Sequence, residues 1–88
     1  MSERPNLLIA ATLADAAEIR REFRQFSSWQ IMTPRNGAGK GWIYGDYTWT
    51  PAAQELPARV RWDLRQRLAS SIDEESEEKD FPTKVLAW

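Results

Sequence analysis

The chain has 88 residues and a net charge of −1, and 42% of its residues are hydrophobic and 28% charged. These values are ordinary for a soluble globular protein, and the length predicts a single domain over residues 1–88. The absence of cysteine and histidine excludes disulfides, zinc sites built from thiolates or imidazoles, and Ser–His–Asp or Cys–His catalysis, so we expect neither enzyme activity nor a cofactor.

The N-terminal MSERPN lacks the basic and apolar regions of a secretion signal. No apolar run approaches the ~20 residues of a membrane-spanning helix. We therefore expect a cytoplasmic protein that does not enter the membrane. The first apolar run, NLLIAA at 6–11, is short and continuous, and it predicts a β-strand.

Thr12 is expected to begin a helix over about 13–26. Its side chain can accept a hydrogen bond from a first-turn amide, and Asp15 follows three residues later, which is a variant of the capping box. Apolar residues then recur at spacings of three and four and form one stripe, which consists of Ala16, Ile19, Phe23 and Phe26.

Two segments rich in β-branched and aromatic residues, 29–34 and 42–49, are predicted strands. Between them lies RNGAGKG, in which an Asn-Gly pair and two further glycines are typical of a hairpin turn. We therefore expect the two strands to pair antiparallel around residues 36–39.

Pro51 and Pro57 are predicted helix starts, because proline suits the first helical position. After Pro57 an apolar residue recurs every four positions, which predicts the main second helix over about 57–72. These apolar residues are Val60, Leu64, Leu68 and Ile72. Trp62 lies about 200° around the helix from the first of them, so we expect its ring outside the stripe.

Residues 73–80, DEESEEKD, are predicted to form a solvated acidic loop that folding does not require. An alternative interpretation is that the carboxylates imitate nucleic-acid phosphates or dock on a basic partner. The acidic residues are Asp73, Glu74, Glu75, Glu77, Glu78 and Asp80. The final TKVLAW, residues 83–88, is predicted to be the last strand.

The predicted order is βαββαβ with a central hairpin, which is typical of a ferredoxin-like sandwich with two helices on one face of a four-stranded sheet. The alternative is a small Rossmann-like parallel sheet. The apolar run LLIAA favours that alternative, since strands of parallel sheets are buried on both faces. The short connection between 29–34 and 42–49 favours the hairpin, because parallel strands need a longer crossover.

KGWIYGDY, residues 40–47, partly resembles the first signature of the RNA recognition motif, [KR]-G-[FY]-[GA]-F-V-x-[FY]. By that resemblance Trp42 and Tyr44 would stack on bases and Lys40 would contact a phosphate. Two positions depart from the pattern, and the first strand offers LLI where the family's second signature has an aromatic residue. The resemblance implies a single-stranded nucleic-acid-binding domain, which is our alternative hypothesis.

The main hypothesis is a non-enzymatic protein-interaction module, either a homodimer or a partner-binding inhibitor or adaptor. A ferredoxin-like domain leaves one sheet face uncovered, and strand alternation puts Trp42 and Tyr44 on that face. Such an apolar face is expected to dock on a second copy or another protein. The predicted interaction surface consists of Lys40, Trp42, Tyr44, Trp62 and Trp88. In style the chain is similar to small proteins encoded by bacterial phages, and an enzyme is the most distant alternative.

Overall fold

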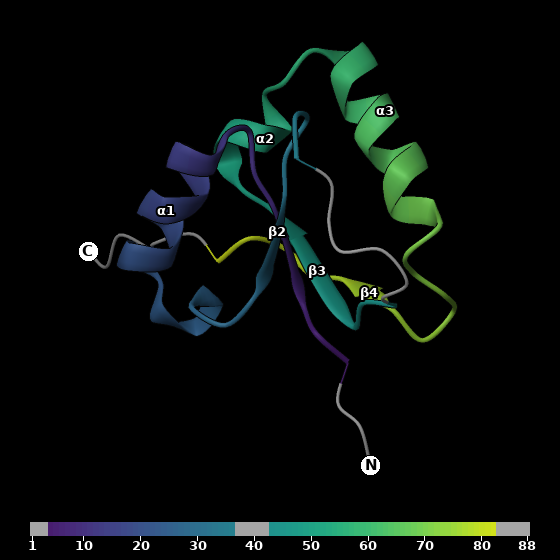
Figure 1. Cartoon of the computed structure of the whole chain (residues 1–88), viewed down its shortest axis with the longest axis horizontal. Coiled ribbons are helices and arrows are strands. Elements are labelled where there is room, and N and C mark those ends of the chain that lie inside the picture. Colours follow the sequence, from purple (N-terminus) through teal and green to yellow (C-terminus); the bar gives the residue numbers. More distant parts are fainter. Residues whose placement is uncertain (1–3, 37–42, 83–88) are drawn as a thin grey trace, which may run out of the picture.

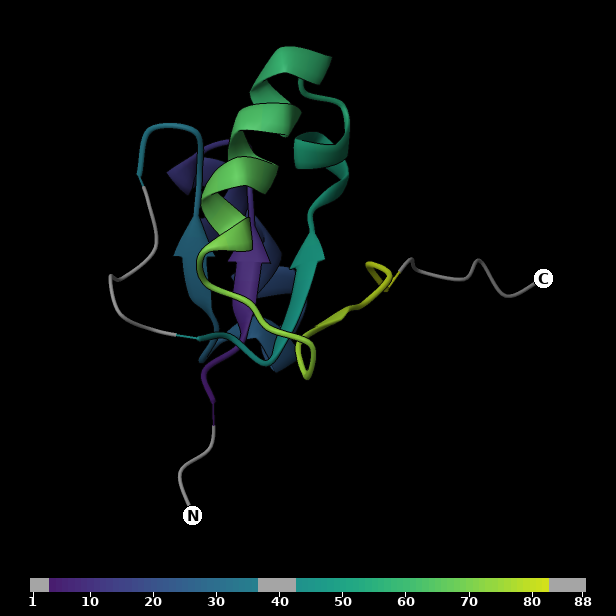
Figure 2. The same cartoon turned by 90° about the vertical axis from the view of Figure 1, so that its right-hand side faces the viewer.

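The computed structural model describes residues 4–36 and 43–82, which form an α/β fold around one four-stranded sheet (Figure 1). Its four short strands are β1 (Leu7–Ile9), β2 (Gln30–Met32), β3 (Asp46–Trp49) and β4 (Glu77–Glu78). Their order across the sheet is β2-β1-β3-β4, and every neighbouring pair is parallel. Figure 2 shows the arrowheads of β2, β1 and β3 side by side at one edge, the carboxyl edge of the sheet.

The helices of the described residues lie on both faces of this sheet. They are α1 (Leu13–Glu22), α2 (Pro51–Gln54) and α3 (Ala58–Ala69), together with a short 3-10 helix, η1 (Arg24–Phe26). α1 lies on one face and α3 on the other, as the two views show (Figures 1 and 2). The elements that connect the strands therefore cover both faces, as parallel sheets require.

The predicted ferredoxin-like sandwich is wrong, and so is the antiparallel pairing of 29–34 with 42–49. β1 lies between β2 and β3, so these two strands do not pair with each other. β3 begins only at Asp46, so the connection from β2 covers residues 33–45. That length meets the dozen or so residues that a parallel crossover needs. The parallel sheet fits the Rossmann-like alternative, while the strand predicted at 83–88 lies outside the described residues.

Each face of the sheet carries its own buried apolar cluster. The cluster on the α3 side consists of Leu7, Ile9, Met32, Tyr44, Trp49, Ala53, Leu64 and Leu68. The cluster on the α1 side consists of Leu8, Ala10, Ala16 and Phe26. β1 contributes to both clusters, which explains why its sequence is apolar without alternation. The uncovered apolar sheet face predicted from the sequence is therefore not found in the described part of the chain.

The start of α1 confirms the predicted cap. Thr12 Oγ1 accepts from the Asp15 amide at 3.0 Å, and Asp15 Oδ2 accepts from the Ala11 amide at 3.0 Å. The same carboxylate oxygen accepts from Thr50 Oγ1 at 2.6 Å, so it also joins the carboxyl ends of β1 and β3. The helix is shorter than predicted, because Phe23 takes an extended conformation and η1 follows.

The acidic segment 73–80 is exposed, as predicted, but it is not only a loop. Two of its residues form β4, which pairs with β3 at the edge of the sheet. Beyond β4, the Lys79 amide donates to Tyr47 O at 2.8 Å, and Thr48 Oγ1 donates to Lys79 O at 2.7 Å. These bonds are made by the backbone of the segment, which a pattern of charged side chains does not reveal.

The carboxylate of Asp73 is bound by the Arg4 guanidinium through two hydrogen bonds, of 2.7 and 2.8 Å. These bonds lower the pKa of Asp73 from 3.8 to about 2. A carboxyl whose folded pKa lies below its unfolded pKa stabilises the fold above the unfolded value, and it loses that contribution as the pH falls through the folded value.

We therefore expect Asp73→Asn to reduce the melting temperature slightly at neutral pH and to have progressively less effect between about pH 4 and pH 2. The effect should be small because the pair is exposed to solvent. Melting temperatures of the two proteins measured over pH 2–7 test this, with Glu74→Gln as the control on the same segment. A constant difference in melting temperature over the whole range of pH would show that the ionised Asp73–Arg4 contact does not stabilise the fold.

Candidate functional site

Of the five residues predicted to form the interaction surface, two, Tyr44 and Trp62, lie within the described residues. Lys40, Trp42 and Trp88 lie outside the described residues. Trp62, on α3, has 63% of its surface exposed, which confirms that its ring lies outside the apolar stripe. A single exposed aromatic ring does not define a binding site.

Tyr44 was predicted to be on the surface, and that prediction is wrong because its side chain is fully buried. The residue precedes β3 instead of lying within it, so strand alternation does not apply. Its amide donates to Ser71 O at 2.8 Å, and its carbonyl accepts from Ser76 Oγ at 2.6 Å. These bonds place Tyr44 next to the end of α3, and its ring packs in the core on that side.

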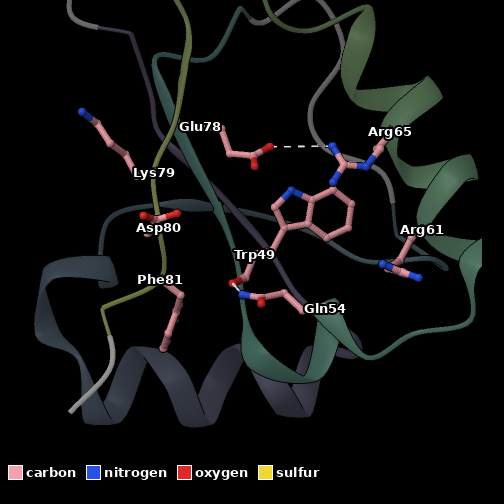
Figure 3. A pocket seen from close by; sticks show the side chains of 8 residues that line it. All are labelled: Trp49, Gln54, Arg61, Arg65, Glu78, Lys79, Asp80 and Phe81. Carbon is pink, nitrogen blue, oxygen red and sulfur yellow. Dashed lines mark hydrogen bonds and ion pairs between the residues drawn. The ribbon is translucent and has the colours of Figure 1, made fainter. Parts of the chain in front are cut away.

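A different feature of the molecule has the character of a binding site: a pocket of about 280 Å³ between α3 and the β4 side of the sheet (Figure 3). We call it the Trp49 pocket. Its lining comes from the end of β3, from α2 and α3, and from β4 and the residues after it. The lining residues are Trp49, Gln54, Arg61, Arg65, Glu78, Lys79, Asp80 and Phe81.

Trp49 carries the most unusual polar group of this pocket. Its side chain is only 6% exposed, and its indole Nε1–H has no hydrogen-bond partner among the described residues. Buried polar groups are nearly always hydrogen-bonded, since an unmade bond costs about 1–3 kcal/mol. In Figure 3 the ring nitrogen points to the side of the pocket where Glu78 lies. The nitrogen itself is buried from solvent, so an acceptor that enters the pocket reaches it only by displacing a neighbouring side chain.

Two arginines of α3 form the wall opposite β4. The Arg65 guanidinium carbon lies 4.9 Å from the centre of the Trp49 ring, within the range of a cation–π contact. Arg61 Nε donates to Leu56 O at 2.9 Å. The terminal nitrogens of Arg61 make no bond or ion pair within residues 4–36 and 43–82. Figure 3 shows both guanidinium groups on the α3 side of the indole ring.

The opposite wall carries negative charge. Glu78 Oε1 lies 3.7 Å from Arg65 Nη1, so the two form an ion pair that is too long for a hydrogen bond. Burial raises the pKa of the Tyr47 phenol, the charge of Glu78 raises it further, and the charge of Arg65 lowers it. Glu78 and Arg65 therefore both lie close to Tyr47 at the edge of β3. Lys79 is paired with Glu77 at 3.4 Å.

The predicted acidic residues make different contacts. Asp73 and Glu75 pair with Arg4 near the start of the chain, whereas Glu78 and Asp80 line the Trp49 pocket. Glu74 forms no ion pair in the part of the chain that the structure describes. The segment is thus divided between contacts with Arg4 and the wall of the Trp49 pocket.

A second pocket, of about 440 Å³, lies at the carboxyl ends of β1 and β2. Open α/β sheets commonly bind ligands at this edge. Arg35 also lines this pocket, but the threonine and asparagine side chains of the pocket are already used: Thr12 caps α1, and Thr33 Oγ1 accepts from the backbone and side-chain nitrogens of Asn36. It lacks an unpartnered buried group comparable to the Trp49 indole, so we assign the candidate site to the Trp49 pocket.

Sequence analysis did not detect this pocket. Its residues extend from position 49 to position 81 and come together only through the parallel pairing of β3 with β4. One signal was present: Arg61 and Arg65 are spaced i, i+4, and therefore share one face of the predicted helix over 57–72. Their partner across the pocket could not be identified without the sheet order.

No helix in the described ranges has the length and apolar character needed to cross a bilayer. Searches with protein-family models, curated proteins and solved structures found no match to this chain. Its candidate function therefore rests on the chemistry of the Trp49 pocket.

Proposed function

We propose that this chain is a non-enzymatic protein-interaction module that binds an acidic segment of a partner protein in the Trp49 pocket. The observation that carries the proposal is the buried indole N–H of Trp49, which lacks a partner among the described residues and belongs to a ring that lines the same pocket as Arg61 and Arg65. All three groups are donors that favour a negatively charged acceptor, and hydrogen bonds to charged groups are the stronger ones, worth about 1.5–3 kcal/mol.

The pocket suits a protein side chain better than a nucleic acid. Its volume of about 280 Å³ lies just below the ~300–1,000 Å³ of typical small-molecule sites. Glu78 and Asp80 on one wall would repel the successive phosphates of a polyanion, whereas one acidic side chain can approach Arg61 and Arg65 from the α3 side. The buried ring of Tyr44 also argues against the nucleic-acid alternative, which needed Tyr44 together with Trp42 as a stacking surface.

A different protein suits the site better than a second copy of this chain. The homodimer hypothesis depended on an uncovered apolar sheet face, and both faces carry buried clusters. A non-enzymatic role is supported by the absence of histidine and cysteine, which leaves the pocket without the usual base for a nucleophile.

The proposal is tested by fluorescence anisotropy with a labelled peptide of alternating glutamate and glycine, compared with the same peptide carrying glutamine. We expect the acidic peptide to bind and the glutamine peptide to bind at least about tenfold more weakly. Arg61→Gln and Arg65→Gln should each weaken binding of the acidic peptide by about tenfold or more. Arg59→Gln is the matched control, because Arg59 is exposed on the same helix but does not line the pocket.

Equal binding of the two peptides, or equal losses in all three arginine variants, would contradict the proposal. A separate titration with single-stranded RNA tests the alternative function, nucleic-acid binding. Binding of RNA that is abolished by Arg61→Gln and falls steeply with added salt would indicate phosphate contacts and a nucleic-acid-binding role. Sedimentation of the protein alone would reveal a homodimer.

A further inference from the structure

We infer that the Trp49 pocket is specific for a carboxylate, and that Glu78 is a built-in competitor that weakens binding of that carboxylate. This inference rests on the proposed function, because it names the chemical group that the pocket accepts and the residue that opposes it. Three observations carry it: the donors around the indole ring, the loose Arg65–Glu78 pair, and the way the backbone holds Glu78 in place.

The first observation concerns the geometry of the donors. The Trp49 indole offers one N–H, and Arg65, whose guanidinium carbon lies 4.9 Å from the centre of the ring, and Arg61 offer planar N–H donors in the same pocket. A carboxylate has two coplanar oxygens, so one can accept from an arginine while the other accepts from the indole. A phosphate dianion would bring a second negative charge toward Glu78 and Asp80. One carboxylate therefore matches the donors at the lowest electrostatic cost.

The second observation is that Glu78 neutralises the charge of Arg65 without accepting a hydrogen bond from Arg65 or from the Trp49 indole. Its carboxylate oxygen is 3.7 Å from Arg65 Nη1 and makes no hydrogen bond to Trp49 Nε1. The side chains of Arg65 and Glu78 are 56% and 46% exposed, and ion pairs at such exposed positions contribute little to stability. An incoming carboxylate can therefore replace Glu78 beside Arg65.

The third observation is that the backbone of Glu78 is held beside Tyr47 at the edge of the sheet. It belongs to β4, and Tyr47 and Glu78 occupy paired positions of the parallel ladder. The following amide, of Lys79, donates to Tyr47 O at 2.8 Å. The backbone thus keeps Glu78 in the lining of the pocket, where the charge of its carboxylate opposes an entering anion, while the Trp49 N–H stays unbonded in the structure.

The test combines peptide binding with the NMR signals of the indole N–H groups. The chain has five tryptophans, and the signal that Trp49→Phe removes identifies Trp49. We expect addition of acetate, or of the glutamate peptide, to shift the Trp49 signal, while inorganic phosphate at equal ionic strength shifts it less. Trp49→Phe should weaken binding of the peptide, because phenylalanine lacks the N–H donor. The variant keeps an aromatic ring at this position.

The decisive variant is Glu78→Gln, which should bind the glutamate peptide about two- to five-fold more tightly, the range that an exposed ion pair covers. Glu75→Gln is the matched control: it removes one negative charge from the same segment, but Glu75 pairs with Arg4 away from the pocket. An equal gain in peptide affinity in both variants would mean that the net charge of the protein, and not the position of Glu78, controls binding.

The outcomes separate this inference from the proposed function. If the peptide binds and requires Arg61, but Glu78→Gln changes nothing and the Trp49 signal does not move, the inference is wrong and the interaction module stands. If acetate shifts the Trp49 signal but no acidic peptide binds, the carboxylate preference stands and the protein-binding role is wrong. If phosphate shifts the signal as strongly as acetate, the carboxylate preference is wrong. If neither acetate nor peptide has an effect, both are wrong.

Discussion

Tyr44→Ala is expected to lower the free energy of unfolding by about 3–5 kcal/mol, the loss that follows truncation of a buried aromatic side chain. The ring is fully buried in the cluster that joins the sheet to α3. Small domains have total stabilities of about 5–15 kcal/mol, so this one change could remove a large share of the stability of the fold. Urea denaturation followed by far-ultraviolet circular dichroism measures the effect.

The neighbouring residue provides the control. Ile43 has 37% of its surface exposed, so Ile43→Ala should cost much less than Tyr44→Ala. Tyr44→Phe keeps the ring and should retain most of the stability, which allows a measurement even if the alanine variant does not fold. Equal, small losses for Ile43→Ala and Tyr44→Ala would instead place the Tyr44 ring on the surface, as the sequence had predicted.

Local signals in the sequence predicted the helices well. The Thr12 cap is confirmed by its hydrogen bond from Asp15, and Thr50 Oγ1 likewise accepts from the Ala53 amide where α2 begins with Pro51. Caps and apolar stripes act over three or four residues, so the chain itself encodes them. The end of the first helix was misplaced, because Phe23 and Phe26 continue the stripe through a 3-10 turn.

The order of the strands was not predictable from the same kind of signal. Asn36-Gly37 is a turn signal, but a turn at one end of a long connection does not decide whether the next strand comes back beside the first. The decisive fact is that β3 begins at Asp46, four residues later than the aromatic run suggested. The sequence of β1, which is apolar on both faces of the strand, correctly indicated a parallel sheet. The short connection and its glycines nevertheless led to the prediction of a hairpin.

The candidate site depends on that strand order, so it could not be found without it. Glu78 lies beside Tyr47 and near Trp49 only because β4 pairs in parallel with β3. The sequence showed the acidic residues and the arginines as separate features of a loop and a helix. Only the tertiary structure brings these residues together around one indole ring. Most of them were not predicted to belong to a binding site.

Leu64→Ala and Leu68→Ala are each expected to lower the free energy of unfolding by about 2–5 kcal/mol, the usual cost of truncating a buried leucine. Both side chains are buried against the sheet, with 0% and 3% of their surface exposed. Trp62→Ala should change the free energy of unfolding by no more than about 0.5 kcal/mol, since surface substitutions rarely cost more. Denaturant titrations of the three variants give the comparison.

This comparison also tests the geometry of the Trp49 pocket. Arg61 and Arg65 lie on the same side of Leu64 around the helix, at roughly 60° and 100° from it, so the orientation that buries Leu64 also turns both arginines toward the pocket that Trp49 lines. A helix rotated enough to bury Trp62 would carry the two arginines away from the indole. A large loss for Trp62→Ala together with a small loss for Leu64→Ala would therefore contradict both the packing of α3 and the binding site. The opposite pattern, which we expect, would leave Arg61 and Arg65 positioned to bind an acidic group.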